Sequence, residues 1–167
     1  MPATRDELMA RLDALGIVTR TVDHAPVFTV EEARALRGEI PGGHCKNLFL
    51  KDDKGAIYLI VCLEDAKIDL KAAPARIGSR RLTFGKPDLL MEILGVEPGS
   101  VTPFGLINDT GRRAAVVLDK TMMEQEWLNY HPLRNDATTT IRAADLLVFL
   151  RATGHEPRIV AVSEPVL

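Results

Sequence analysis

The sequence is poor in cysteine and in aromatic residues, and it carries no strong excess of charge of either sign. Its 167 residues include two cysteines, Cys45 and Cys62, with 5% aromatic residues and a formal net charge of −2. Two cysteines do not form a disulfide framework, so reduced thiols are the simplest expectation. Without an overall positive field, a general DNA-binding role is disfavoured, and any contact with nucleic acid must be local and small.

Long apolar runs and metal-ligand patterns are missing as well. No apolar stretch approaches the length needed to span a bilayer, and charged residues interrupt the leucines near the N-terminus, which argues against a signal peptide. The histidines and cysteines lack the spacing of metal ligands. The G-x-S-x-G, H-E-x-x-H and P-loop patterns do not occur either. We therefore expect a cytoplasmic protein with no membrane contact, no metal and no cofactor.

The remaining pattern is that of a mixed α+β protein. Apolar periodicity, capping boxes at Thr4 and Thr29, and glycine stops predict helices in the ranges 4–16, 29–36, 69–78, 87–95, 121–127 and 142–153. Apolar or alternating runs predict strands at 17–22, 46–52, 56–63, 81–84, 114–118, 138–141 and 158–162. A turn at 53–55 joins two of these strands as an antiparallel hairpin. No linker or repeat divides the chain, so we expect one domain over residues 1–167.

Residues 41–50 form the first candidate for chemistry. A glycine turn leads to Lys46 and Asn47, and the apolar run 48–50 that follows predicts a strand buried on both faces. A cation at the edge of such a strand is half desolvated and held in place, which suits a fixed contact to an anion or a developing oxyanion. The alternative is that Lys46 extends from the strand end into solvent.

Residues 96–105 form the second candidate, because two prolines and two glycines in ten residues fix an irregular loop. Backbone N–H groups of such a loop can point at a ligand, and Gly99 allows another molecule to approach the main chain closely. The alternative is an ordinary connection between a helix and a strand. The residues concerned are Gly99, Ser100, Val101, Thr102 and Pro103.

Residues 129–138 form the third candidate. His131 precedes a proline, so its backbone must be extended and its ring projects away from any helix. With Asn135 and Thr138 it offers neutral donors and acceptors, a composition that fits the reading of a sugar hydroxyl or an amide better than metal binding. The alternative is a polar loop whose Asn and Thr side chains satisfy their own backbone.

A fourth stretch, residues 24–29, places Val27 and Phe28 before a helix that begins at Thr29. These side chains could form the wall of a small apolar pocket. A hydrophobic staple beneath the capping box explains them equally well.

Together and in this order, the four stretches resemble the YbaK/prolyl-tRNA synthetase-associated editing domain superfamily, and within it the free-standing ProX (PrdX) group. The specific matches are K-N-L-F-L at 46–50, G-x-x-x-P at 99–103 and H-P at 131–132. The resemblance covers nearly the whole chain. It implies a single α+β domain with a mixed, curled sheet flanked by helices, and hydrolysis of the ester that joins an amino acid to the 3′-terminal adenosine of tRNA.

The resemblance also implies a substrate, partners and roles. The substrate is the tRNA(Pro) acceptor end carrying alanine, and prolyl-tRNA synthetase is a further candidate partner. Cys-tRNA(Pro) or another small aminoacyl group, or a non-catalytic RNA- or protein-binding role, are the alternatives. Catalytic roles fall on Lys46, Gly99 and His131, with a positioned water as the attacking group. Substrate-binding roles fall on Val27, Phe28, Thr29, Asn47, Ser100, Val101, Thr102, Pro103, Asn135 and Thr138.

Overall fold

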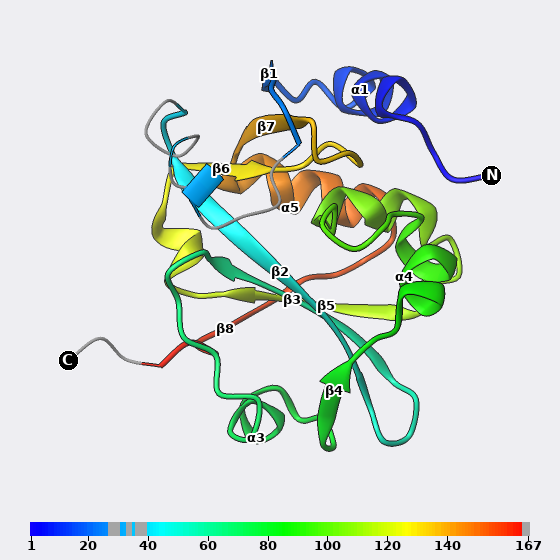
Figure 1. The fold of residues 1–167 in the computed structure, drawn as a ribbon, viewed down its shortest axis with the longest axis vertical. Helices are drawn as coiled ribbons and strands as arrows, with labels where there is room; N and C mark the ends of the chain where they lie inside the picture. The colour runs from blue at the N-terminus through cyan, green and yellow to red at the C-terminus, as the bar shows by residue number, and fades with distance from the viewer. Residues whose placement is uncertain (27–30, 33–34, 36–39, 165–167) are drawn as a thin grey trace.

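One mixed, eight-stranded sheet runs through the computed structural model, and helices pack against it (Figure 1). The structure describes residues 1–26, 31–32, 35 and 40–164. The strand order is β1-β7-β6-β2-β3-β5-β8, and β4 pairs with β2 beside this path. The sheet contains both parallel pairs (β2 with β6, β3 with β5, β5 with β8) and antiparallel ones, which confirms the predicted mixed sheet of an α+β domain.

The elements have the following bounds. The strands are β1 Arg20–Asp23, β2 Gly43–Asp52, β3 Ile57–Leu63, β4 Leu82–Phe84, β5 Ala114–Asp119, β6 Trp127–Tyr130, β7 Ala137–Arg142 and β8 Arg158–Val160. The α-helices are α1 Arg5–Ala14, α3 Ala73–Ile77, α4 Pro87–Leu94 and α5 Ala143–Ala152, and the short 3₁₀ helices are η1 Pro103–Asn108 and η2 Met122–Glu124. No described helix has the length and apolar character needed to cross a membrane.

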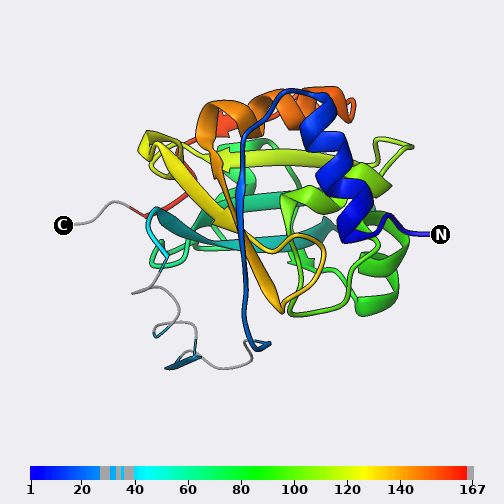
Figure 2. The same ribbon diagram turned by 90° about the horizontal axis from the view of Figure 1, so that it is seen from above.

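Strand β2 connects the two halves of the sheet. Its first residues, Gly43 and His44, pair in parallel with β6, whereas residues 45–51 pair antiparallel with β3 in an unbroken register. Figure 1 shows β2 as the long diagonal strand, and Figure 2 shows β6 and β7 crossing it at a steep angle. The sheet therefore turns sharply at the start of β2, where the first candidate stretch lies.

Each face of the sheet has its own apolar core. On one face, α1, α4 and α5 cover a large cluster in which Phe104 meets Tyr130 and Phe149 edge-on, with ring centroids 6.0 and 5.4 Å apart. On the other face, α3 covers a smaller cluster that includes Leu50 and Ile60. Burial on both faces explains why the central strands are almost continuously apolar.

Most elements match the sequence predictions where local signals define them. Thr4 forms the predicted capping box with Glu7, Gly95 ends α4 in the left-handed conformation, and the 53–55 turn joins β2 to β3. In the run 48–50, Phe49 is buried on one face of the sheet and Leu50 on the other, whereas Leu48 is half-buried.

Other boundaries were wrong. The predicted helix at 121–127 is only the turn η2, because Trp127 already begins β6 and pairs with β7. The segment 69–78 is helical only over α3, since Asp69 accepts from the Lys71 N–H in a turn that precedes the helix. The first strand starts at Arg20 and not at Ile17, which is buried against the large cluster. The predicted helix at 29–36 falls mostly outside the described residues.

Candidate functional site

The pleat of β2 separates the two polar residues that the sequence places side by side. Lys46 pairs with Cys62 and Asn47 with Val61 in consecutive register, so their side chains project from opposite faces of the sheet. Asn47 shares its face with Phe49 and the large cluster, and Lys46 shares its face with Leu50 and the small cluster. The Lys46 and Asn47 side chains of the first candidate stretch thus lie in two different surroundings.

Lys46 is half-buried, and its ammonium donates a hydrogen bond to the carbonyl of Ala66 in the turn after β3. Its neighbour Cys62 is buried, and that burial raises the pKa of the Cys62 thiol to about 11, although the Lys46 charge acts in the opposite direction. The side chain of Lys46 is therefore attached to the main chain and does not extend freely into solvent.

Asn47 connects β2 to the loop of residues 99–103, here called the 99–103 loop. Its Nδ2 donates to the carbonyl of Val101 at 3.1 Å. A carbonyl only accepts, so this bond fixes the orientation of the amide. The other amide atom, Oδ1, is buried and finds no hydrogen-bond partner among the described residues. Such an acceptor costs free energy until a donor reaches it.

The 99–103 loop is held by its own capping bonds. Gly99 is exposed and has a φ of +92°, a conformation that favours glycine. Ser100 donates its N–H to the carbonyl of Glu97, and Thr102, fully buried, accepts from the N–H of Phe104 at the start of η1. A Cβ added at Gly99 would lie 3.9 Å from the side-chain nitrogen of Asn135, so this loop and the third candidate stretch are neighbours.

His131 is half-buried at the end of β6. Its Nδ1 lies 2.9 Å from the carbonyl oxygen of Ala137 and must donate to it, because a carbonyl only accepts. Burial lowers the pKa of His131, and the nearby ring of His24 acts in the same direction. At neutral pH the ring is therefore uncharged, and its Nε2 carries a lone pair that can accept a proton or a hydrogen bond.

His24, the first residue of the fourth candidate stretch, belongs to the same cluster, although the sequence assigned it no role. Its Nε2 lies 2.8 Å from the hydroxyl of Thr138, and its ring centroid lies 6.4 Å from that of His131. Thr138 is buried, so its hydroxyl serves this contact between segments and not its own backbone. No local pattern marks the pair, because 114 residues separate the two partners along the chain.

The structure thus joins residues of all four candidate stretches, the fourth through His24 alone. Asn47, the 99–103 loop and Asn135 form one group, and His24, His131 and Thr138 form a second group on the same 131–138 segment. The predicted pocket walls Val27 and Phe28, and Thr29 with them, lie outside the described residues.

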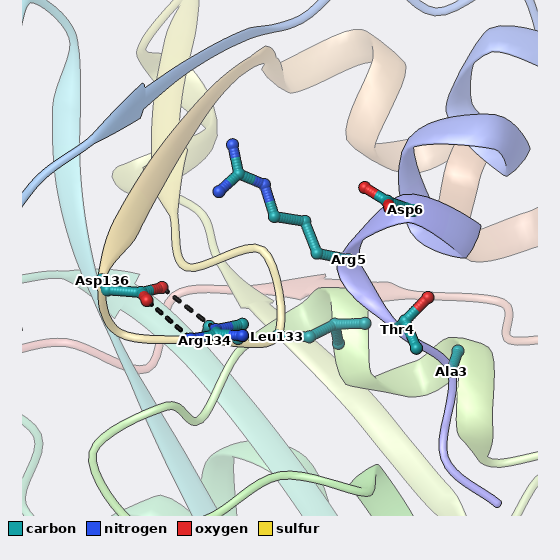
Figure 3. A pocket seen from close by; sticks show the side chains of 7 residues that line it. All are labelled: Ala3, Thr4, Arg5, Asp6, Leu133, Arg134 and Asp136. Carbon is teal, nitrogen blue, oxygen red and sulfur yellow. Dashed lines mark hydrogen bonds and ion pairs between the residues drawn. The ribbon is translucent and has the colours of Figure 1, made fainter.

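A cleft of about 470 Å³ opens between the start of α1 and the turn that follows His131 (Figure 3). Arg134 pairs with Asp136 at 2.8 Å, and Arg5 pairs with Asp23, so carboxylates neutralise both arginines. The cleft therefore offers polar groups without a net positive charge. Its described lining consists of Ala3, Thr4, Arg5, Asp6, Leu133, Arg134 and Asp136.

The electrostatics favour hydrogen bonding over covalent catalysis. Burial raises the pKa of the Cys45 thiol to about 12 and raises the pKa of the Cys62 thiol as well. Both thiols therefore stay protonated at neutral pH and are poor nucleophiles. In the described part of the chain, no three His, Cys, Asp or Glu side chains group in a way that could hold a metal ion. The groups that remain are a neutral imidazole, side-chain amides, a lysine ammonium and loop main chain, which can position a water and an ester.

Comparison with known proteins places these residues in a recognisable context. Residues 24–149 match the model of the aminoacyl-tRNA editing domain. The prolyl-tRNA editing protein ProX of Acetoanaerobium sticklandii is 38% identical over 90% of this chain and 93% of its own length. Prolyl-tRNA synthetase associated domain-containing protein 1 of Mus musculus is 40% identical over 93% of this chain and 94% of its own length.

Solved structures share the fold. The crystal structure of a candidate trans-editing enzyme for prolyl tRNA synthetase superposes with a TM-score of 0.72 at 20% identity, covering 99% of this chain and 100% of that one. At this identity the likeness concerns the fold alone, and it matches the mixed sheet flanked by helices.

Proposed function

The chain belongs to the aminoacyl-tRNA editing domain family, and from this membership we propose that it is a trans-editing hydrolase that removes alanine from mischarged tRNA(Pro). The observation that carries the proposal is the neutral His131. His131 lies on the 131–138 segment, and Asn135 of that segment neighbours the 99–103 loop to which Asn47 is bonded. These groups suit an activated ester, which needs a positioned water more than a strong base.

In the proposed reaction, water adds to the ester carbonyl and the bond from that carbon to the ribose oxygen breaks. The proton lost by the water ends on the ribose oxygen, giving free alanine and an uncharged tRNA 3′ end. His131 would accept a hydrogen bond from a ribose hydroxyl through Nε2 and so orient the terminal adenosine. Asn47 would hold the 99–103 loop beside the aminoacyl group through its bond to Val101.

Lys46 takes a separate role in this proposal. Its ammonium lies on the opposite face of β2 from Asn47, which favours a contact to the terminal phosphate over one to the ester carbonyl. An ammonium is a compact point charge that suits a phosphate, and the carbonyl of Ala66 holds it near the strand edge before substrate binds.

Selection of alanine over proline would depend on space. A synthetase pocket built for proline cannot fully exclude a smaller residue, so a second site that admits only the smaller residue provides a double sieve. The 99–103 loop, Val27 and Phe28 are the proposed walls. The ordinary hydrophobic contact of one methylene is worth only about 1–3 kcal/mol, so stronger selection requires a steric clash.

The test is a deacylation panel with the purified chain. The substrates are tRNA(Pro) charged with alanine, cysteine or proline, and alanine on its cognate tRNA, each corrected for its rate without protein. Ala-tRNA(Pro) should react fastest, and Pro-tRNA(Pro) should stay close to its uncatalysed rate. A ratio of alanine to proline rates near one would overturn the editing assignment. Faster turnover of Cys-tRNA(Pro) would support a deacylase but replace alanine by cysteine as the preferred aminoacyl group. No turnover of any substrate would indicate a non-catalytic binding module.

A further inference from the structure

His24 makes three hydrogen bonds, and the two that involve its ring fix which ring nitrogen carries hydrogen. Its main-chain N–H donates to the carbonyl of Asp136 at 2.9 Å, which joins the end of β1 to the start of β7. Its Nδ1 lies 2.7 Å from the carbonyl oxygen of Ala25 and must donate to it. In the neutral ring, Nε2 is then an acceptor, and its partner at 2.8 Å is the hydroxyl of Thr138.

This arrangement also sets the direction of the Thr138 hydroxyl. Because His24 Nε2 accepts, the hydroxyl hydrogen of Thr138 points at the ring, and the oxygen lone pairs stay available to another donor. If His24 takes up a proton, both of its nitrogens become donors. Thr138 must then accept from the ring, and its hydrogen is released. One proton on His24 thus frees the Thr138 hydroxyl hydrogen for another acceptor and leaves Thr138 with one lone pair fewer to offer to a donor.

His24 and His131 are also coupled electrically, since their ring centroids lie 6.4 Å apart. The charged groups around the pair are Asp136, which favours the charged form of His131, and the pairs Arg134–Asp136 and Arg5–Asp23, which are close to neutral. A proton on His24 therefore makes a proton on His131 less favourable.

We propose that His24 is a positioning residue for the deacylation, whose neutral ring holds the Thr138 hydroxyl as an acceptor toward substrate and whose protonated ring disfavours a proton on His131. The inference rests on the proposed deacylase function. It assigns no contact between His24 and the substrate, because the effect passes through Thr138 and through charge. Thr138 in its acceptor state suits a substrate hydroxyl or ammonium, both of which are donors.

Two substitutions separate the two parts of this role. His24→Gln keeps an acceptor that can reach the Thr138 hydroxyl but cannot take a charge. His24→Ala removes the acceptor as well. Thr21→Val is the matched control, because Thr21 makes a similar hydroxyl bond of 2.8 Å to Thr139 between the same two strands, β1 and β7, without a titratable partner.

The measurement is kcat/KM for Ala-tRNA(Pro) between about pH 5 and 8, where histidine changes charge. His24→Ala should lose about tenfold at neutral pH, the order expected for one hydrogen bond, whereas His24→Gln should stay near wild type there. In His24→Gln the low-pH limb should move to higher pH. Two unit charges at 6.4 Å shift a titration by about 0.5 pH unit in water and up to about 2 at an effective dielectric of 20. Thr21→Val should change neither kcat/KM at neutral pH nor the position of the low-pH limb.

A second measurement needs no substrate. Imidazole nitrogen NMR of the wild-type chain should show Nδ1–H tautomers for both rings, and His24→Gln should raise the pKa of His131. If the neutral His24 carries its hydrogen on Nε2, or if the two variants behave alike in rate and pH profile, the proposal is wrong. An inactive wild type with the expected tautomers and titration would count against the deacylase function, while the coupling between the two rings would stand.

Discussion

Asn47 offers a sharp test of the site, because its contribution to stability and its contribution to activity should differ. One half of its amide is bonded to Val101, and the other half, Oδ1, is buried without a partner among the described residues. Asn129 is the matched control on β6. Its amide is buried, donates to the carbonyls of Pro41 and Gly43, and accepts from the hydroxyl of Thr140.

The two alanine variants should therefore unfold differently. In Asn47→Ala, loss of one hydrogen bond costs about 0.5–1.5 kcal/mol, but removal of a buried, unpaired oxygen returns about 1–3 kcal/mol. The free energy of unfolding should therefore fall by no more than about 0.5 kcal/mol, and these figures allow a rise of up to about 2.5 kcal/mol. Asn129→Ala loses three satisfied bonds and leaves the Thr140 hydroxyl unpaired, which should cost about 2–4 kcal/mol.

Activity should respond in the opposite way. Asn47→Ala frees the 99–103 loop from β2, and misplacement by about 1 Å can cost about a hundredfold in rate. Urea unfolding followed by circular dichroism gives the stabilities, and deacylation of Ala-tRNA(Pro) gives the rates. If Asn47→Ala is destabilised as much as Asn129→Ala, the unpaired oxygen is not a cost in the free protein. If it keeps the wild-type rate, the bond to Val101 does not position the loop.

Four further outcomes follow from the structure. Lys46→Ala should lower deacylation by about a hundredfold, as loss of a charged contact to the substrate would, with an unchanged circular dichroism spectrum; a wild-type rate would remove Lys46 from the site. EDTA should leave the rate unchanged, and loss of activity that zinc restores would contradict a metal-free mechanism. Binding of tRNA should weaken only modestly with salt, since a chain of net charge −2 neutralises few phosphates, and a steep dependence would indicate an extended interface. Phe28→Ala should bring the rates on alanine and proline closer together, and an unchanged ratio would exclude Phe28 as a wall.

Local signals predicted most of the fold because they act within a few residues. The Thr4 capping box, the Gly95 stop and the hairpin turn at 53–55 are each defined by neighbouring side chains. Strand β6 escaped prediction because its extended form depends on partners in β7 and at the start of β2, which no local pattern encodes. Tertiary pairing outweighed the helical tendency of the preceding residues.

The candidate site illustrates what a sequence leaves open. The sequence marked the stretches that hold Asn47, Gly99 and His131, and the structure shows how these stretches lie beside one another. The sequence also contained enough information to place the Lys46 and Asn47 side chains on opposite faces of the sheet, since neighbouring residues in a strand point to opposite faces. The contact between His24 and Thr138 could not be found this way, because 114 residues separate them and no local pattern pairs them, although Thr138 itself was a candidate.

Three hydrogen bonds give the proposed site its chemical character, two between segments far apart in the sequence and one within the 131–138 segment. Asn47 binds Val101, His131 binds Ala137, and the His24 ring is bonded to a threonine hydroxyl. Each bond fixes the direction of a donor or an acceptor without placing a charge in the site. A net-acidic chain repels a polyanion at long range, so contacts at short range must select the substrate. Fixed neutral acceptors meet that need, because they discriminate by the position of the hydroxyl and ammonium groups that a substrate presents.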